Sequence, residues 1–309
     1  MTDFWTILLF VLAVFLIFYN FSTKFHYYVR ISFFYITILL HGMEVCVTMI
    51  PSWLGSKGAD YVFHSFYYWS KWTGIHTTVY NYEITQVDGP AIVICNHQNI
   101  LNILSLPNPT KSRQRTPKMK VSKKVHSSLD IVSMSSVWPK HCAVMMKRIL
   151  AYVPFFNLGA YFSSTIFIDR FNRERAMASV DYCATEMKKR NLKLWVFPEG
   201  TRNRDGGFIP FKKGAFNIAV RAQLPIIPVV FSDYRTFYSK PGRYFKNDGE
   251  VVIRVLDPIP TEGLTLDDVN ELSDKCRDLM LVAYREVTAE AWKRTADRRG
   301  EQLVDKKID

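Results

Sequence analysis

A histidine and an aspartate that could transfer a proton together lie on either side of an unusual segment. The apolar run 91–95 leads into His97, and Asp130 follows only after the 28 residues 99–126. Without that segment Asp130 would stand five positions after His97. A neutral histidine can take a proton from a hydroxyl, and a carboxylate on its other nitrogen fixes the tautomer and stabilises the imidazolium. The spacing predicts a general base and its orienting acid, separated by an insertion.

The inserted segment has a composition that cannot build a packed core. It contains three prolines and no acidic residue, and its basic residues are Lys111, Arg113, Arg115, Lys118, Lys120, Lys123 and Lys124. Such a segment is expected to form a mobile loop. Three interpretations stay open: a solvated loop, an electrostatic contact with anionic lipid at about 1 kcal/mol per basic residue, or a segment absent from the main gene product.

Three pairings of base and acid are compatible with the insertion. Joining His97 to Asp130 requires residues 99–126 to loop out, which costs only about 1.7 kcal/mol if closure entropy is the main term. Joining His97 to Asn102 keeps the local spacing but loses the carboxylate. Joining His126 to Asp130 keeps the carboxylate but is one residue short. We favour the first pairing.

Three later segments bring polar side chains to the ends of apolar runs. The first ends in Arg170. The second contains Gly200, which permits close backbone approach, and Arg202, whose planar guanidinium suits a phosphate. The third is an apolar run stiffened by Pro225 and Pro228. Each segment alone is weak evidence for a site, but their order and spacing together are specific.

Together these segments resemble the lysophosphatidic acid acyltransferases of the glycerolipid acyltransferase superfamily. The family's first motif, Asn-His-Gln-Ser-Ser-Leu-Asp, matches residues 96–98 joined to 127–130. Its second, Phe-Ile-Asp-Arg, matches 167–170, and its third, Phe-Pro-Glu-Gly-Thr-Arg, matches 197–202 without change. The Pro-Ile-Ile-Pro segment matches 225–228. The resemblance covers roughly residues 77–260, and it departs from the family pattern at the insertion.

The resemblance implies acyl transfer from acyl-CoA to the sn-2 hydroxyl of 1-acylglycerol 3-phosphate (lysophosphatidic acid), giving phosphatidic acid. It implies that His97 is the general base and that Asp130 orients it. The residues implied to position the glycerol phosphate are Arg170, Glu199, Gly200, Thr201 and Arg202. The residues implied to shape the acyl or CoA channel are Pro225, Ile226, Ile227 and Pro228. No metal or bound cofactor is expected, since acyl-CoA is a co-substrate.

Two rival functions remain. One is an acyltransferase acting on glycerol 3-phosphate or another lysophospholipid. The other is a membrane protein that keeps the fold while the insertion disables the base. The formal charge of +12 suits anionic partners, but a nucleic-acid partner is not expected because much of the charge lies in one loop. The five scattered cysteines indicate neither a disulfide framework nor a zinc site.

The elements that must position these residues follow an α/β rhythm. Strands are expected at 79–84, 91–95, 143–146, 165–168, 194–197, 226–231 and 251–255. Helices are expected at 130–138, capped by Ser127 and Ser128, and at 173–190, 211–222 and 264–287. This alternation predicts an α/β fold with a central, mostly parallel sheet flanked by helices. We expect an acyltransferase domain over residues 56–292 and a charged, frayed tail over 293–309.

The N-terminal residues 1–55 are predicted to form membrane helices. Residues 4–21 carry no charge and would span about 27 Å as a helix, close to the ~30 Å hydrocarbon core. A second apolar stretch, 31–50, contains His41 and Glu44 on one helix face and could span, pack against the first helix or lie re-entrant. An aromatic-rich helix at the membrane interface is expected over 53–72. We expect membrane lipids as partners and the endoplasmic reticulum as the location.

Overall fold

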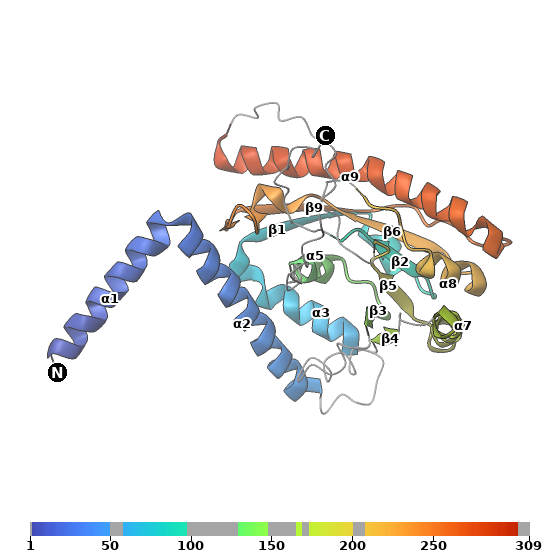
Figure 1. Cartoon of the computed structure of the whole chain (residues 1–309), viewed down its shortest axis with the longest axis horizontal. Helices are drawn as coiled ribbons and strands as arrows, with labels where there is room; N and C mark the ends of the chain where they lie inside the picture. Colours follow the sequence, from blue (N-terminus) through green and yellow to red (C-terminus); the bar gives the residue numbers. More distant parts are fainter. Residues whose placement is uncertain are drawn as a thin grey trace, which may run out of the picture.

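The sheet predicted from the sequence forms the centre of the molecule (Figure 1). In this computed structural model the described residues are 2–49, 58–97, 129–147, 165–168, 173–199 and 208–301. The inserted segment 99–126, the two cap serines, Asp169, Arg170, Gly200, Thr201 and Arg202 therefore lie outside the described residues.

Seven strands form the main sheet in the order β1-β9-β6-β2-β5-β3-β4. They are β1 (Ile75–Tyr80), β2 (Ile92–Cys95), β3 (Cys142–Lys147), β4 (Ile166–Ile168), β5 (Lys193–Val196), β6 (Ile226–Phe231) and β9 (Gly249–Val255). Every neighbouring pair is parallel except β6 and β9. The predicted mostly parallel α/β sheet is thus confirmed.

Helices cover both faces of this sheet, and β2 shows how the sequence separates them. Val93 and Cys95 point into one apolar core, whereas Ile92 and Ile94 point into the other. The first core is closed by α2 (Thr23–Met49), α3 (Gly58–Trp69) and α5 (Asp130–Val137). The second is closed by α7 (Arg173–Arg190), α8 (Gly214–Ala222) and α9 (Val269–Arg299), of which α9 runs along the sheet in Figure 1.

The first strand lies earlier in the chain than predicted. We expected a strand over 79–84, but β1 ends at Tyr80 and a short helix, α4 (Tyr82–Gln86), follows it. Asn81 turns the chain in the left-handed conformation (φ 59°), and its side-chain amide donates to the Val255 carbonyl at 3.0 Å. Asparagine tolerates this backbone region better than most residues, so the strand stops there.

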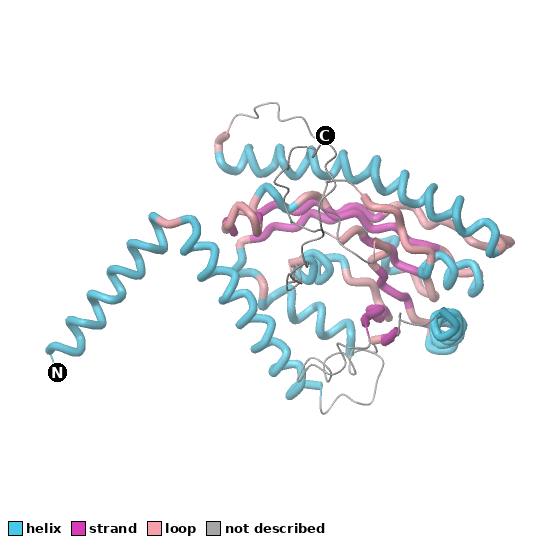
Figure 2. The backbone as a smooth tube through the Cα atoms, viewed as in Figure 1, coloured by secondary structure: helices cyan, strands magenta, loops and turns pink. Residues whose placement is uncertain are grey.

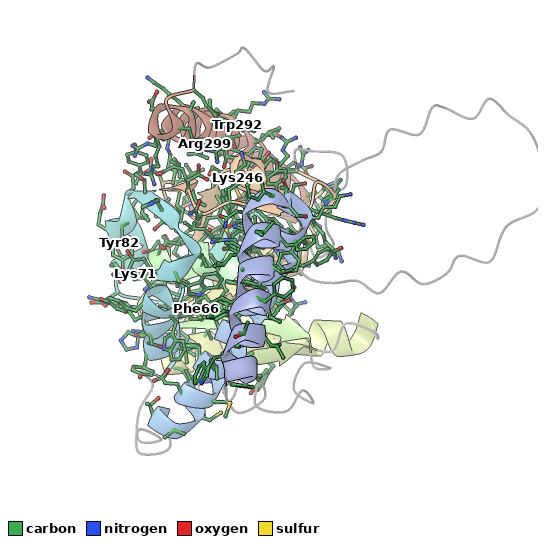
Figure 3. The ribbon with its side chains drawn as sticks, turned by 90° about the vertical axis from the view of Figure 1, so that its left-hand side faces the viewer. Phe66, Lys71, Tyr82, Lys246, Trp292 and Arg299 are labelled. Carbon is green, nitrogen blue, oxygen red and sulfur yellow. The ribbon has the colours of Figure 1, made fainter. Side chains whose placement is uncertain are left out.

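The last helix is longer than predicted and replaces the start of the expected tail. A 3₁₀ turn, η4 (Leu266–Asp268), opens with a capping box between Thr265 and Asp268, and α9 then continues to Arg299. Its final turns pair with acids on and beside β9: Arg298 contacts buried Glu250 at 2.8 Å, and Arg299 pairs with Asp248. Figure 3 labels Arg299 at this end of α9. Because these acidic partners are distant in sequence, the sequence alone predicted a frayed tail from residue 293 in place of the end of α9.

A small hairpin that the sequence did not reveal lies beside α2. It consists of β7 (Tyr238–Ser239) and β8 (Tyr244–Phe245). The ring of Tyr27 on α2 lies 6.1 Å from that of Tyr238, and Phe34 lies 6.4 Å from Phe245, measured between ring centroids. The second N-terminal helix is therefore packed onto the α/β body along one face.

The two N-terminal helices differ in how they meet the rest of the molecule. Both α1 (Thr2–Phe21) and α2 are long and apolar enough to cross a membrane. Residues Phe4–Phe21 bury none of their side chains, and Figure 2 shows α1 pointing away from the body. On α2, His41 lies 3.9 Å from Glu44, as their shared face predicted, and its ring meets the Ser65 hydroxyl of α3 at 2.8 Å.

Candidate active site

The site begins where β2 ends at the carboxyl edge of the parallel strands. Asn96 follows the buried strand, and its side-chain amide donates to the Phe231 carbonyl at 3.0 Å while its oxygen accepts from the Phe231 N–H at 2.8 Å. These two bonds tie the end of β2 to the end of β6. Asn96 therefore fixes the direction in which the next residue, His97, leaves the sheet.

His97 and Asp130 form an ion pair in the structure. The Nδ1 atom of His97 faces a carboxylate oxygen of Asp130, whose side chain is 5% exposed, whereas that of His97 is 23% exposed. Of the three pairings compatible with the insertion, this is the one the structure forms, and Asn102 and His126 lie outside the described residues. With Nδ1 occupied by the acid, Nε2 is the atom of the ring able to accept a proton from a substrate.

Asp130 is delivered by the first turn of α5. The residue in the cap position is Leu129, whose side chain makes no capping hydrogen bond, so the expected serine cap does not stand at that position. The amino end of a helix carries partial positive charge and favours a carboxylate there. Helix α5 thus supplies both the position of Asp130 and a favourable field for its charge.

Glu199 lies directly behind His97. It follows β5, it is 2% exposed, and its Oε1 accepts a hydrogen bond from the backbone N–H of His97 at 3.1 Å. Burial raises the pKa of Glu199 to about 7, although that hydrogen bond opposes the change. The ring of His97 also packs against Phe197, with centroids 4.8 Å apart. The phosphate-positioning role expected of Glu199 stays a prediction, and its observed contact is with His97.

The other residues expected to bind phosphate are Arg170, Gly200, Thr201 and Arg202, all outside the described residues. The strands that precede them are described. Strand β4 ends at Ile168 and β5 at Val196, and both are in a parallel series with β2. The carboxyl ends of parallel strands meet at one edge of a sheet, which is where α/β sheets bind ligands. Their predicted role is compatible with this topology and stays a prediction.

The segment Pro225, Ile226, Ile227 and Pro228 lies toward the opposite end of the sheet. In the parallel pair of β2 and β6, Ile226 is level with Ile92 and Val229 with Cys95, so Pro225 starts the strand far from His97. The Pro225 carbonyl accepts from the Ile92 N–H at 2.9 Å. The segment therefore forms the start of β6, and its role in an acyl channel stays a prediction.

Two residues near the pair were not singled out from the sequence. The Ser133 hydroxyl of α5 lies 2.5 Å from the hydroxyl of Tyr234, which follows β6 and is fully buried. Neither belongs to a spacing pattern with obvious chemistry, so only the fold brings them together. Within the described ranges no cluster of three or more His, Cys, Asp or Glu side chains could hold a metal ion.

Comparisons with known proteins decide the family. The Acyltransferase family model matches residues 124–232. The candidate 1-acyl-sn-glycerol-3-phosphate acyltransferase acl-2 of Caenorhabditis elegans is 73% identical over 308 residues, covering 99% of both chains. This chain belongs to the 1-acyl-sn-glycerol-3-phosphate acyltransferase family. It is therefore an enzyme of acyl transfer.

Two more distant comparisons also point to acyltransferases. The mouse 1-acyl-sn-glycerol-3-phosphate acyltransferase alpha is 44% identical over 164 residues, covering 53% of this chain and 58% of that protein. The crystal structure of the acyltransferase PlsC from Thermotoga maritima superposes with a TM-score of 0.63 at 19% identity, covering 86% of this chain and 99% of that one. That likeness supports the fold. The family match begins at residue 124, near the end of the insertion, and therefore does not include His97.

Proposed function

We propose that this enzyme transfers an acyl group from acyl-CoA to the sn-2 hydroxyl of 1-acylglycerol 3-phosphate and so forms phosphatidic acid. The observation that carries the proposal is the pairing of His97 Nδ1 with the buried Asp130 carboxylate at the carboxyl edge of the sheet. The names of the relatives support the acceptor, because they specify 1-acyl-sn-glycerol 3-phosphate.

In the proposed reaction His97 Nε2 takes the proton from the acceptor hydroxyl as its oxygen attacks the thioester carbonyl carbon. A carbon–oxygen bond forms and the carbon–sulfur bond then breaks. The proton on His97 passes to the departing CoA sulfur, so the free base is restored. Asp130 stabilises the imidazolium between these two transfers. The sequence contains no Gly-x-Ser-x-Gly nucleophile, which favours direct attack over an acyl-enzyme.

The acceptor carries a phosphate, and its proposed ligands are Arg170, Glu199, Gly200, Thr201 and Arg202. Arginine can bind a phosphate through two parallel hydrogen bonds, among the stronger hydrogen bonds in proteins. Pro225, Ile226, Ile227 and Pro228 are proposed to shape the acyl or CoA channel. The residues already described perform the proton transfer, so the proposed chemistry uses no metal or bound cofactor.

The substrates are lipids, and the N-terminal helices fit a membrane location. Residues Phe4–Phe21 expose apolar side chains along their whole length, which is costly in water and favourable in hydrocarbon. We infer that α1 inserts into a membrane, that membrane lipids contact α1 and the free face of α2, and that the compartment is the endoplasmic reticulum. Fractionation of cells expressing the tagged chain, with and without residues 1–21, tests this.

Two rivals are separated by one assay. The purified full chain in detergent is given radiolabelled acyl-CoA with lysophosphatidate, glycerol 3-phosphate or another lysophospholipid. We expect the highest kcat/KM with lysophosphatidate. A preference for another acceptor would change the substrate, and no transfer to any acceptor would favour a protein disabled by the insertion. The formed ion pair of His97 and Asp130 argues for the active enzyme.

A further inference from the structure

Helix α5 is joined to neighbouring elements by two hydroxyl pairs. Near its amino end, Ser133 Oγ lies 2.5 Å from the Tyr234 hydroxyl. One turn later, Thr77 of β1 donates to Ser136 Oγ at 2.9 Å. Asp130 and Ser133 are three residues apart, so they lie on adjacent turns of one helix face. The first hydroxyl pair is therefore beside the catalytic acid, and the second is removed from it.

Three hydrogen bonds hold the backbone around Tyr234. Two residues earlier, Ser232 Oγ accepts from the Val252 N–H of β9 at 3.0 Å. The Asp233 N–H donates to Thr288 Oγ1 of α9 at 3.2 Å, and its carboxylate accepts from the Arg235 N–H at 2.8 Å. The phenol of Tyr234 is 0% exposed. Its hydroxyl thus has a fixed position with respect to the sheet.

That fixed hydroxyl stands in the field of the catalytic acid. Burial, followed by the neighbouring Asp130 carboxylate, raises the pKa of Tyr234 well above its ordinary value. The hydroxyl consequently keeps its proton at physiological pH. A protonated phenol can donate or accept, and its partner here is Ser133 Oγ at 2.5 Å.

We propose that Tyr234 is a positioning residue for the His97–Asp130 pair: its hydroxyl, fixed relative to the sheet, holds Ser133 and with it the first turn of α5, which carries Asp130. The inference rests on the proposed function and deepens it. In this chain 32 residues separate His97 from Asp130. A short connection cannot hold the acid in register here, so a contact from the end of β6 takes over that task.

The topology makes this contact effective. Asn96 joins the end of β2 to Phe231 at the end of β6, and Tyr234 is three residues further along the same chain segment. The base and the residue that holds its acid are thus fixed to the same two strand ends. A displacement of Asp130 of about 1 Å can cost on the order of 10²-fold in rate.

The test compares Tyr234→Phe with Thr77→Val, which removes the other hydroxyl contact of α5. Steady-state acyl transfer is measured in detergent with the acceptor that the unmodified enzyme uses best. We expect Tyr234→Phe to lower kcat about 10- to 100-fold while both KM values stay within about twofold. Thr77→Val should keep kcat within about twofold. Ser133→Ala combined with Tyr234→Phe should be no worse than Tyr234→Phe, because the two act through one contact.

A second readout does not depend on turnover. The His97 Nδ1–H proton should give a downfield nuclear magnetic resonance signal that Asp130→Asn shifts. We expect Tyr234→Phe to shift or broaden that signal and Thr77→Val to leave it in place. If the enzyme proves inactive on every acceptor, the proposed function fails while this signal still tests the positioning role. An unchanged signal, an unchanged kcat, or equal losses in Tyr234→Phe and Thr77→Val would overturn the inference.

Discussion

The buried carboxylate of Glu199 accepts a hydrogen bond from the backbone N–H of His97 at 3.1 Å. The same carboxylate that holds the base in place has its pKa raised to about 7, mainly by burial. A motif residue expected to serve the substrate thus also supports the base, and its charge state changes near neutral pH.

The burial of Glu199 predicts how stability depends on pH. The folded-state pKa of Glu199 lies above the unfolded value of about 4.5, so the unfolded chain releases this proton first as the pH rises. The contribution of Glu199 to stability is therefore full below about pH 4.5 and is lost as the pH rises toward 7. The shift of the Glu199 pKa between the unfolded and folded states corresponds to at most about 3 kcal/mol of the free energy of unfolding.

Glu199→Gln tests this point because the amide oxygen can still accept from His97 while the charge is gone. We expect the midpoint temperature of unfolding to fall less for the variant than for the unmodified enzyme between pH 5 and pH 8. Thermal unfolding followed by circular dichroism in detergent measures the two midpoints. Parallel pH curves for the two proteins would show that another group governs the change.

Replacing the proposed base, His97, should remove most of the activity. His97→Ala is expected to lower kcat by a factor of about 10²–10⁴, because proton removal by a positioned side chain contributes that much. His126→Ala serves as the matched control, since His126 is the alternative partner of Asp130 and should be replaceable with little loss. An active His97→Ala beside an inactive His126→Ala would transfer the role of base to His126.

Loss of the proposed phosphate fork should affect one substrate more than the other. Arg202→Ala is expected to raise the KM for lysophosphatidate about tenfold or more, since a lost hydrogen bond to a charged group costs about 1.5–3 kcal/mol. The KM for acyl-CoA should change much less. Initial rates at varied concentrations of each substrate separate the two effects. Equal increases would remove Arg202 from the phosphate site and point to a general disturbance.

Removing the insertion should improve the enzyme. Deletion of residues 99–126 joins Gln98 to Ser127 and restores the five-residue offset between His97 and Asp130. Shorter closure loses less entropy and holds the pair more firmly, so stability should be at least equal and kcat/KM higher. Both proteins are compared in the same membrane preparation. A misfolded or less active deletion variant would make the insertion an integral part of this enzyme.

The sequence predicted elements best where local pattern and burial agree. The run 226–231 is wholly buried and forms β6 with the predicted bounds, and α7 begins and ends where its charged and apolar residues indicated. Local pattern failed where distant partners decide. Asn81 ends β1 through a bond to Val255, and Arg298 extends α9 through Glu250. Neither partner can be inferred from its neighbours in the chain.

The site divides in the same way. His97, Asp130 and Glu199 could be proposed from motif residues alone, and the structure brings the three together. Tyr234 and Ser133 have no motif chemistry of their own, and their contact exists only because the fold brings α5 to the segment that follows β6. Residues that act on substrate tend to reveal themselves by type, whereas residues that hold them reveal themselves by position.

The antiparallel pairing of β6 with β9 places the start of β1 at the edge of the sheet that carries His97. Because β9 runs opposite to β6 and parallel to β1, β1 begins at the same edge of the sheet as the one where β2 ends, with β9 and β6 between them. The chain thus arrives from α2 and α3 at the reacting edge. If α1 inserts into a bilayer as proposed, a lysolipid would reach His97 by lateral diffusion in two dimensions. Its effective concentration is then the mole fraction in the surrounding lipid, and added inert lipid dilutes the substrate at constant bulk concentration.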